Sequence, residues 1–335
     1  MSALLEVSDL KVAHNGDPIV DGVDLTLKQG EALGLAGESG CGKTTTALAL
    51  MKLLPASLKQ SGAVTLRPPG AEEPINIGRR TEAGMQLVRW RHVSLIFQGA
   101  MNSLDPVQRI NAQMAEAIRL HPIPNGEKDV GKRIGELLRT VGLTPGLGRR
   151  YAHQLSGGQR QRVMIALALA CDPSLVIADE PTTALDVVMQ AQVLELLEGL
   201  RQRLGLALIL ISHDLGVLAE TCDRIAVMYA GRIVESGPVS SVFEDPQHPY
   251  TKRLLASLPV IGGERGLAAP IPGGPPDPSA MPSGCRFAPR CPYTAERCQE
   301  DPQLREIAER HAVACHFAPW KEWPQVEVTT AEAAG

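Results

Sequence analysis

The segment GESGCGKTT, residues 37–45, has the residue types and spacing of a loop that binds phosphate. Gly37, Gly42, Lys43 and Thr44 match the pattern G-x-x-x-x-G-K-[ST]. In this pattern the glycines let backbone N–H groups turn toward phosphate oxygens, the lysine reaches the β- and γ-phosphates, and the hydroxyl can ligate Mg²⁺. The expected nucleotide contacts are Gly37, Glu38, Ser39, Gly40, Cys41, Gly42, Lys43, Thr44 and Thr45.

Two adjacent acids, Asp179 and Glu180, end the apolar run SLVIADE. Carboxylates at the end of a buried strand are costly unless a cation or ligand uses them. We expect Asp179 to hold Mg²⁺ and Glu180 to polarise an attacking water; an N-terminal helix cap is the alternative. His213 follows another apolar run in LISHD, and together with the phosphate loop it favours a γ-phosphate contact over a structural role.

Alternating strands and helices must position these residues. Short apolar runs separated by helical patterns predict an α/β domain, with a helix over QAQVLELLEGLRQRLG. Buried strands are expected at residues 31–37, 93–98, 174–180, 206–213 and 224–231.

Composition excludes several classes of protein. The 335 residues carry a net charge of -4 and are 44% hydrophobic, which suits a large soluble domain with a smaller one appended. No apolar run approaches the ~18 residues that cross a bilayer, and the N-terminus lacks a secretory pattern, so a cytoplasmic protein is expected. Without a Lys/Arg block, nucleic acid is not an expected partner.

Composition also divides the chain. An α/β nucleotide-binding domain is expected over residues 1–250, with a helical subdomain at about 102–154. A stretch rich in Gly and Pro over residues 251–284 predicts a linker, followed by a four-cysteine extension at 285–320 and a polar tail at 321–335.

The run LSGGQRQR, residues 155–162, decides the class when it is combined with the phosphate loop, DEPTTALD and SHD. Together these motifs resemble the ATP-binding subunits of ABC transporters over most of residues 4–250. The resemblance implies the P-loop ABC-type fold, with ATP as nucleotide. It also implies that two cassettes sandwich two nucleotides, and that the residues closing over ATP held by the partner are Ser156, Gly157, Gly158 and Gln159.

Three further positions take their roles from this family. Gln98 matches a glutamine that senses Mg²⁺ and the attacking water while touching the membrane subunit, and Asp186 matches an aspartate at the dimer interface. His14 stands where the family usually has an aromatic residue that stacks on adenine. For His14, an exposed turn residue beside Asn15 is an equal alternative.

The segments DEPTTALDVVMQAQVLELL and PQHPYTKRLL resemble the oligopeptide and dipeptide importer branch, which also includes nickel and oligosaccharide importers. This implies a peripheral position on the cytoplasmic side of the inner membrane. The implied partners are a paralogous ATPase in a heterodimer, two transmembrane permeases and an extracytoplasmic substrate-binding protein. A homodimer of this chain is the alternative to the heterodimer. An exporter subunit, or a soluble ABC ATPase acting on nucleic acid, is the alternative.

Four cysteines crowd the C-terminal part of the sequence at the spacing C-x5-C-x6-C-x16-C. In a cytosolic chain such clustering indicates metal binding rather than disulfides. The resemblance to the importer branch implies a [4Fe-4S] cluster, whereas four thiolates could also hold Zn²⁺ or remain unmetallated. The expected ligands are Cys285, Cys291, Cys298 and Cys315.

Overall fold

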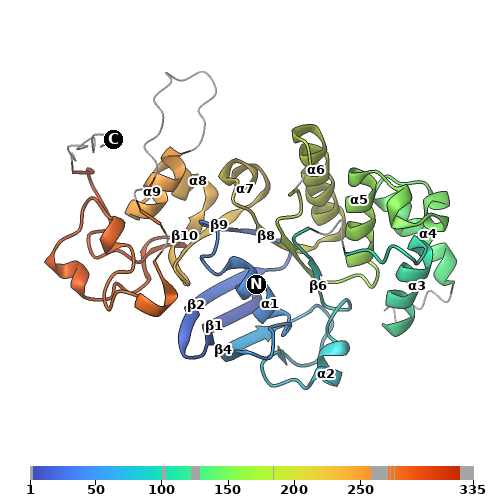
Figure 1. The fold of residues 1–335 in the computed structure, drawn as a ribbon, viewed down its shortest axis with the longest axis horizontal. Coiled ribbons are helices and arrows are strands. Elements are labelled where there is room, and N and C mark those ends of the chain that lie inside the picture. Colours follow the sequence, from blue (N-terminus) through green and yellow to red (C-terminus); the bar gives the residue numbers. More distant parts are fainter. Residues whose placement is uncertain are drawn as a thin grey trace, which may run out of the picture.

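The computed structural model describes residues 3–99, 103–121, 129–183, 185–257, 271, 273–274 and 276–324. These ranges form two β-sheets with helices packed around them (Figure 1). The mixed α/β architecture predicted from the alternation of apolar runs and helical patterns is confirmed.

The larger sheet has eight strands within the described residues, in the order β11-β12-β10-β9-β3-β8-β7-β6. Strands β9, β3, β8, β7 and β6 are parallel to one another, and β10, β12 and β11 continue the sheet antiparallel. All five predicted strands are present. The strands are β3 (Ala32–Ala36), β6 (Val93–Ile96), β7 (Leu175–Asp179), β8 (Ala207–Ile211), β9 (Arg224–Tyr229), β10 (Arg232–Pro238), β11 (Arg305–Ala308) and β12 (His311–Val313).

Both faces of the parallel strands are buried, which explains their uninterrupted apolar sequences. Along β8, Leu208 and Leu210 point into a core shared with the helices, whereas Ile209 and Ile211 point into a second core. The second core lies between the larger sheet and a four-stranded antiparallel sheet of order β2-β1-β4-β5. Its strands are β1 (Ala3–His14), β2 (Asp17–Lys28), β4 (Leu58–Leu66) and β5 (Ile75–Asn76).

The helices fall into groups that Figure 1 separates. Helix α1 packs between the two sheets, α6 to α9 cover the other face of the larger sheet, and α3, α4 and α5 cluster at one end. None of the helices in the described ranges has the length and apolarity of a membrane span. The bounds are α1 (Lys43–Leu50), α2 (Glu82–Gln86), α3 (Ile110–Leu120), α4 (Val130–Thr140), α5 (Gly157–Ala168), α6 (Val187–Leu204), α7 (Leu215–Thr221), α8 (Val239–Glu244) and α9 (Pro249–Ala256).

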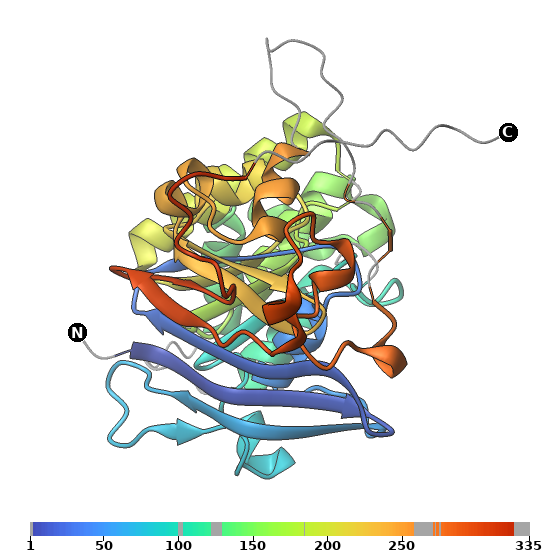
Figure 2. The same ribbon diagram turned by 90° about the vertical axis from the view of Figure 1, so that its left-hand side faces the viewer.

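The C-terminal extension lies across the edge of both sheets (Figure 2). Its strand β12 pairs with β10, so that it continues the larger sheet, and Phe287 is buried in the core of the cassette. The predicted domain boundaries stay predictions. Parts of four predicted segments lie outside the described residues: 1–2, 100–101 and 184 of the nucleotide-binding domain, 102 and 122–128 of its helical subdomain, 258–270, 272 and 275 of the linker, and 325–335 of the tail.

Candidate ATP-binding site

The phosphate loop joins the end of β3 to the start of α1. Gly37 and Gly42 both have positive φ angles, of 145° and 107°. A Cβ at Gly37 would lie 2.2 Å from the carbonyl oxygen of Met228, and one at Gly42 would lie 2.9 Å from that of Ile19. Both positions therefore require glycine, because of the backbone conformation and because of the space available.

Lys43 is buried at the first turn of α1. Its Nζ donates to the carbonyl oxygen of Gly37 at 2.7 Å and to that of Glu38 at 2.9 Å. These bonds keep the ammonium group inside the loop, where phosphate oxygens can replace the carbonyl groups as acceptors. Of the other predicted loop contacts, Ser39, Gly40 and Thr44 are exposed, Thr45 is half-buried and Cys41 is buried.

Asp179 ends β7, a strand that α1 packs against. Its side chain is buried, and its Oδ1 has no hydrogen-bond partner within the described part of the chain. Burial raises the pKa of Asp179, and a hydrogen bond with the Thr44 side chain opposes this rise. A buried carboxylate oxygen without a partner, close to a hydroxyl, is a donor set that fits a hard cation. Thr44 and Asp179 therefore fit Mg²⁺.

Three side chains converge on Glu180. Gln98 Nε2 donates to its Oε2 at 2.9 Å, Thr183 Oγ1 donates to the same oxygen at 2.8 Å, and His213 Nδ1 lies 3.2 Å from Oε1. Burial alone would raise the pKa of Glu180, but these hydrogen bonds outweigh burial and hold the pKa below its usual value. At neutral pH the ionised carboxylate can accept a proton from water. Glu180 also has a positive φ of 46°, a strained conformation that is common at active sites.

The sequence predicted Gln98, Glu180 and His213 as site residues. It did not predict Thr183 or two contacts with the phosphate loop. Thr183 lies in the quoted run DEPTTALD, so its place three residues after Glu180 was an available signal. The Glu38 N–H donates to the Tyr250 hydroxyl, and Arg290 pairs with the Glu38 carboxylate. No local pattern links residue 38 to residues 250 and 290.

The signature residues cap helix α5. Ser156 Oγ accepts the N–H of Gln159 at 3.3 Å, and the Gln159 side chain accepts the N–H of Ser156 at 3.1 Å. Ser156 is exposed, whereas Gly158 is buried, and a Cβ there would lie 1.8 Å from the terminal methyl group of Met189, which would have to move. Helix α5 packs against α3, α4 and α6, while α1 packs against β1, β2 and β7. The signature and the phosphate loop therefore belong to different parts of this fold (Figure 1).

The remaining predicted contacts lie at the ends of a strand and of two helices. Gly157, next to Ser156, is half-buried at the start of α5, and His14 is exposed at the end of β1. Asp186 caps α6 by accepting the N–H of Met189 at 2.9 Å. Adenine stacking by His14 and an interface role for Asp186 stay predictions.

The four cysteines of the extension line one small cavity, together with Phe287, Tyr293 and Trp320. Burial raises the pKa of Cys285 to about 11 and that of Cys291 to about 12. Among the described residues, no three His, Cys, Asp or Glu side chains are grouped closely enough to hold a metal ion. The cysteines thus share a cavity without forming the tetrahedral arrangement of a zinc site.

Comparison with known sequences explains this arrangement of motifs. The family described as ABC transporter matches residues 20–183, and the oligopeptide/dipeptide transporter C-terminal region matches residues 234–298. The oligopeptide transport ATP-binding protein AppD of Bacillus subtilis is 44% identical over 322 residues, which cover 94% of this chain and 97% of AppD. The chain belongs to the ATP-binding proteins of ABC transporters. A probable peptide ABC transporter ATP-binding protein of Sinorhizobium fredii is 45% identical, with 93% and 94% of the two chains covered.

Solved ABC structures share the fold of this cassette. The protein cbiO1 of Clostridium perfringens, part of the ABC transporter complex cbiONQ, aligns with a TM-score of 0.62 at 26% identity, covering 73% of this chain and 92% of that chain. A dimeric post-hydrolysis state of the ATP-binding cassette MJ0796, bound to ADP and Pi, aligns with a TM-score of 0.59 at 25% identity, covering 70% and 98%. The chain is therefore an ABC ATPase, which hydrolyses ATP to ADP and phosphate.

Proposed function

We propose that this ABC ATPase is the energy-coupling subunit of an importer for dipeptides and oligopeptides. The observation that carries the proposal is the match of residues 234–298 to the oligopeptide/dipeptide transporter C-terminal region. It is supported by identity to AppD along nearly the whole length of both chains. The names of these relatives state peptide transport, and this chain shares with them both the cassette and the region that follows it.

In the proposed hydrolysis step each residue has one task. Lys43 binds the β- and γ-phosphates. Thr44 and Asp179 would hold Mg²⁺, and the ion would neutralise phosphate charge. Glu180 accepts the proton of the attacking water, with its carboxylate held by Thr183 and Gln98. The exposed ring of His213, next to Glu180, is free to reach the γ-phosphate.

The proposal gives the chain several partners. The exposed signature at Ser156 acts on ATP held by a second, paralogous cassette, so the working unit is a heterodimer. Two transmembrane permeases bind the helical region near residues 102–154, and a substrate-binding protein delivers cargo from outside the cytoplasm. The ATPase itself lies on the cytoplasmic side of the inner membrane.

Affinity capture from detergent-solubilised membranes of the native host tests this assembly. We expect the tagged chain to recover two polytopic proteins, a paralogous ATPase and a binding protein that carries peptides. If the recovered binding protein carried nickel chelates or oligosaccharides, the proposed peptide substrate would be wrong, but the importer function would stand. Recovery of soluble nucleic-acid-binding partners only would contradict the transport function, although the ATPase would stand.

We also propose a [4Fe-4S] cluster in the extension, bound by Cys285, Cys291, Cys298 and Cys315. Support comes from the single cavity that these cysteines line. A cluster takes each thiolate at a different iron, so its ligands need not meet at one point as the ligands of a single ion must. Where bound, the cluster would supply cross-links within a loop-rich segment that has little core of its own.

Iron analysis of the full chain, purified without oxygen, tests the cluster. About four iron atoms per chain and a broad visible absorption are expected, because a cubane cluster holds four irons on four cysteines. Stoichiometric zinc, or protein without iron or visible absorption, would contradict the proposal. This measurement is independent of ATP hydrolysis.

A further inference from the structure

Glu38 is the first residue of the phosphate loop after Gly37, and all of its polar groups are engaged. Its N–H donates to the Tyr250 hydroxyl at 2.9 Å, and its carbonyl oxygen accepts from Lys43 Nζ at 2.9 Å. Its carboxylate receives both terminal nitrogens of Arg290, at 2.7 and 3.0 Å. Two of these three partners lie beyond residue 247, far along the chain from the loop that they hold.

Arg290 approaches the loop from inside the extension. It ends a short 3-10 turn (Ala288–Arg290) directly before Cys291, and its side chain is only 6% exposed. The guanidinium also donates to the Gly273 carbonyl oxygen at 3.1 Å and lies 5.6 Å from the centre of the Tyr229 ring. A bidentate, largely buried arginine–carboxylate pair fixes orientation more firmly than a surface pair does.

The second contact is also held by packing with the extension. Tyr250 is completely buried, and its ring centre lies 4.7 Å from that of Tyr229 and 5.5 Å from that of Phe287. Because Phe287 belongs to the extension, the position of the Tyr250 hydroxyl depends on how the extension packs. Both contacts with Glu38 therefore depend on the same segment.

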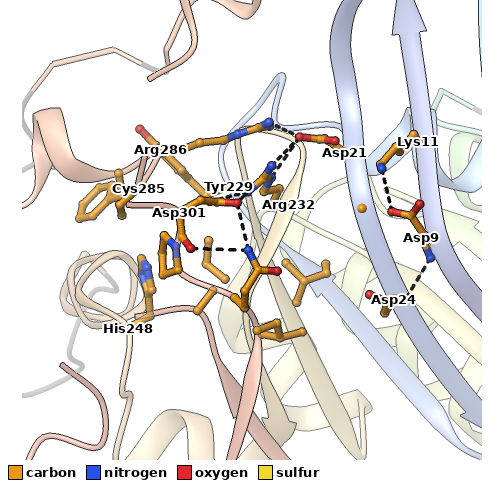
Figure 3. Close-up of a pocket in the computed structure, with 18 residues that line it drawn as sticks. Asp9, Lys11, Asp21, Asp24, Tyr229, Arg232, His248, Cys285, Arg286 and Asp301 are labelled. Carbon is orange, nitrogen blue, oxygen red and sulfur yellow. Dashed lines mark hydrogen bonds and ion pairs between the residues drawn. The ribbon is translucent and has the colours of Figure 1, made fainter. Parts of the chain in front are cut away.

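Ion pairs fix the extension to the cassette near this point. Figure 3 shows Arg286 and Arg232 converging on Asp21 of β2, beside a cavity of about 280 Å³ at the seam. Arg232 also pairs with Asp301 of the extension. The segment that carries Arg290 is thus held on more than one side, so the position of Arg290 relative to the loop is defined.

The charge of Glu38 gives this contact a consequence for nucleotide binding. A carboxylate in a loop that receives a polyanion repels it, and the repulsion is stronger in a partly buried loop than in water. We propose that Arg290 is a positioning residue for ATP: it neutralises Glu38, holds the carboxylate away from the phosphate cradle and makes ATP affinity depend on the docked extension. The proposal concerns ATP binding by the cassette and does not depend on which solute is transported.

Equilibrium binding of ATP to the full-length chain tests the proposal. We expect Arg290→Ala to raise the Kd for ATP about tenfold, within the range usual for coupled sites, while kcat of the assembled complex at saturating ATP stays near wild type. In a Glu38→Gln background the same substitution should change the Kd by less than about twofold, because no charge is left to neutralise. An unchanged Kd after Arg290→Ala, or an equal rise in both backgrounds, would overturn the proposal.

Arg310→Ala is the matched control. Arg310 of the extension also forms an ion pair with a glutamate of the cassette, Glu31. Glu31 directly precedes β3, at the end of the strand opposite the phosphate loop. We expect this variant to lower the melting temperature and to bind ATP with wild-type affinity. If it weakened ATP binding as much as Arg290→Ala, the effect would come from general loosening of the extension, and the positioning role would be refuted.

Two further variants keep the test decisive. If Arg290→Ala does not fold, Arg290→Lys can be tested instead, because lysine retains the charge without the bidentate geometry. We expect an intermediate rise in the Kd for ATP, and wild-type affinity would count against the proposal.

Lys43→Ala should abolish ATP binding. If Lys43→Ala bound ATP normally, the nucleotide site itself would be misassigned, an outcome distinct from failure of the Arg290 role alone.

Discussion

Glu180 has a defined ionisation state and a fixed position because its neighbours supply hydrogen bonds. Gln98 comes from the end of β6, Thr183 from the turn after β7, and His213 from the end of β8. Since the carboxyl ends of parallel strands meet at one edge of a sheet, residues far apart in sequence reach the same carboxylate.

Glu180→Gln should separate binding from hydrolysis. The amide keeps the shape of the side chain but cannot accept a proton, so we expect kcat to fall by about 10²–10⁴-fold. The Kd for ATP should stay near wild type. Phosphate release in the assembled complex and ATP binding to the isolated chain measure the two quantities, and turnover at the wild-type rate would show that another group is the base.

Thr183→Ala should change the pH dependence of hydrolysis. Glu180 accepts a proton only when ionised, so kcat falls as the pH drops through its pKa. Loss of the Thr183 hydroxyl removes one of the hydrogen bonds that lower this pKa, and the acid limb of the profile should move to higher pH. Thr182→Ala is the control, because within the described part of the turn Thr182 makes no hydrogen bond to Glu180. Equal profiles for the two variants would refute the explanation.

At the scale of elements, the segment Gln247 to Tyr250 connects the cassette to its extension. The carboxylate of Glu235 on β10, fully buried, accepts the N–H groups of Gln247 and His248 and contacts His311 of β12 at 2.8 Å. Burial lowers the pKa of His248 to about 3, so its neutral Nδ1 can accept the N–H of Tyr250. One buried carboxylate thereby orients both the segment that carries Tyr250 and the strand that extends the sheet.

Glu235→Ala should destabilise the protein strongly. It leaves the donors of Gln247, His248 and His311 buried without their acceptor, a change of about 3–5 kcal/mol in the free energy of unfolding. Urea unfolding followed by circular dichroism measures the loss. Glu244→Ala, at an exposed position at the end of α8, should change stability by less than about 0.5 kcal/mol. Similar losses in the two variants would contradict the role given to Glu235.

The elements also mark how far sequence reasoning reaches. Predominantly apolar segments of six to eight residues predicted β3, β6, β7, β8 and β9, because strands buried on both faces have few polar positions. The antiparallel sheet of β1, β2 and β4 was not predicted, and neither was the pairing of β12 with β10. The contact of Arg290 with Glu38, 252 residues apart, depends on tertiary packing that no local pattern records.

At the scale of the whole molecule, the proposed dimer would use two separate surfaces of this chain. The phosphate loop with Asp179 and Glu180 forms one surface, and the exposed cap of α5 at Ser156 belongs to another part of the fold. The N-terminus of α5, a helix of 12 residues, is exposed and suited to binding an anion. That anion would be the phosphate of a nucleotide other than the one bound at this chain's own phosphate loop. We therefore expect turnover to require two cassettes.

Ser156→Asp tests the use of this surface in trans. Aspartate preserves the cap of α5 but places a negative charge where the partner's phosphates would approach. ATP binding to the isolated chain should be unchanged, whereas turnover in the complex should fall by about 10²-fold, as for loss of a group that stabilises phosphate charge. Ser156→Asn, a neutral cap, should retain more turnover. Equal loss of ATP binding by the isolated Ser156→Asp chain would argue for a site in cis.

The most direct test of the central claim is peptide transport by the complete complex, reconstituted in liposomes with its binding protein outside and ATP inside. We predict that labelled oligopeptides accumulate in the lumen, that the binding protein with peptide stimulates ATP hydrolysis, and that Glu180→Gln abolishes both. ATP hydrolysis that is indifferent to peptide and binding protein, with no accumulation of peptide in the lumen, would contradict the assignment of this chain as the ATPase of a peptide importer.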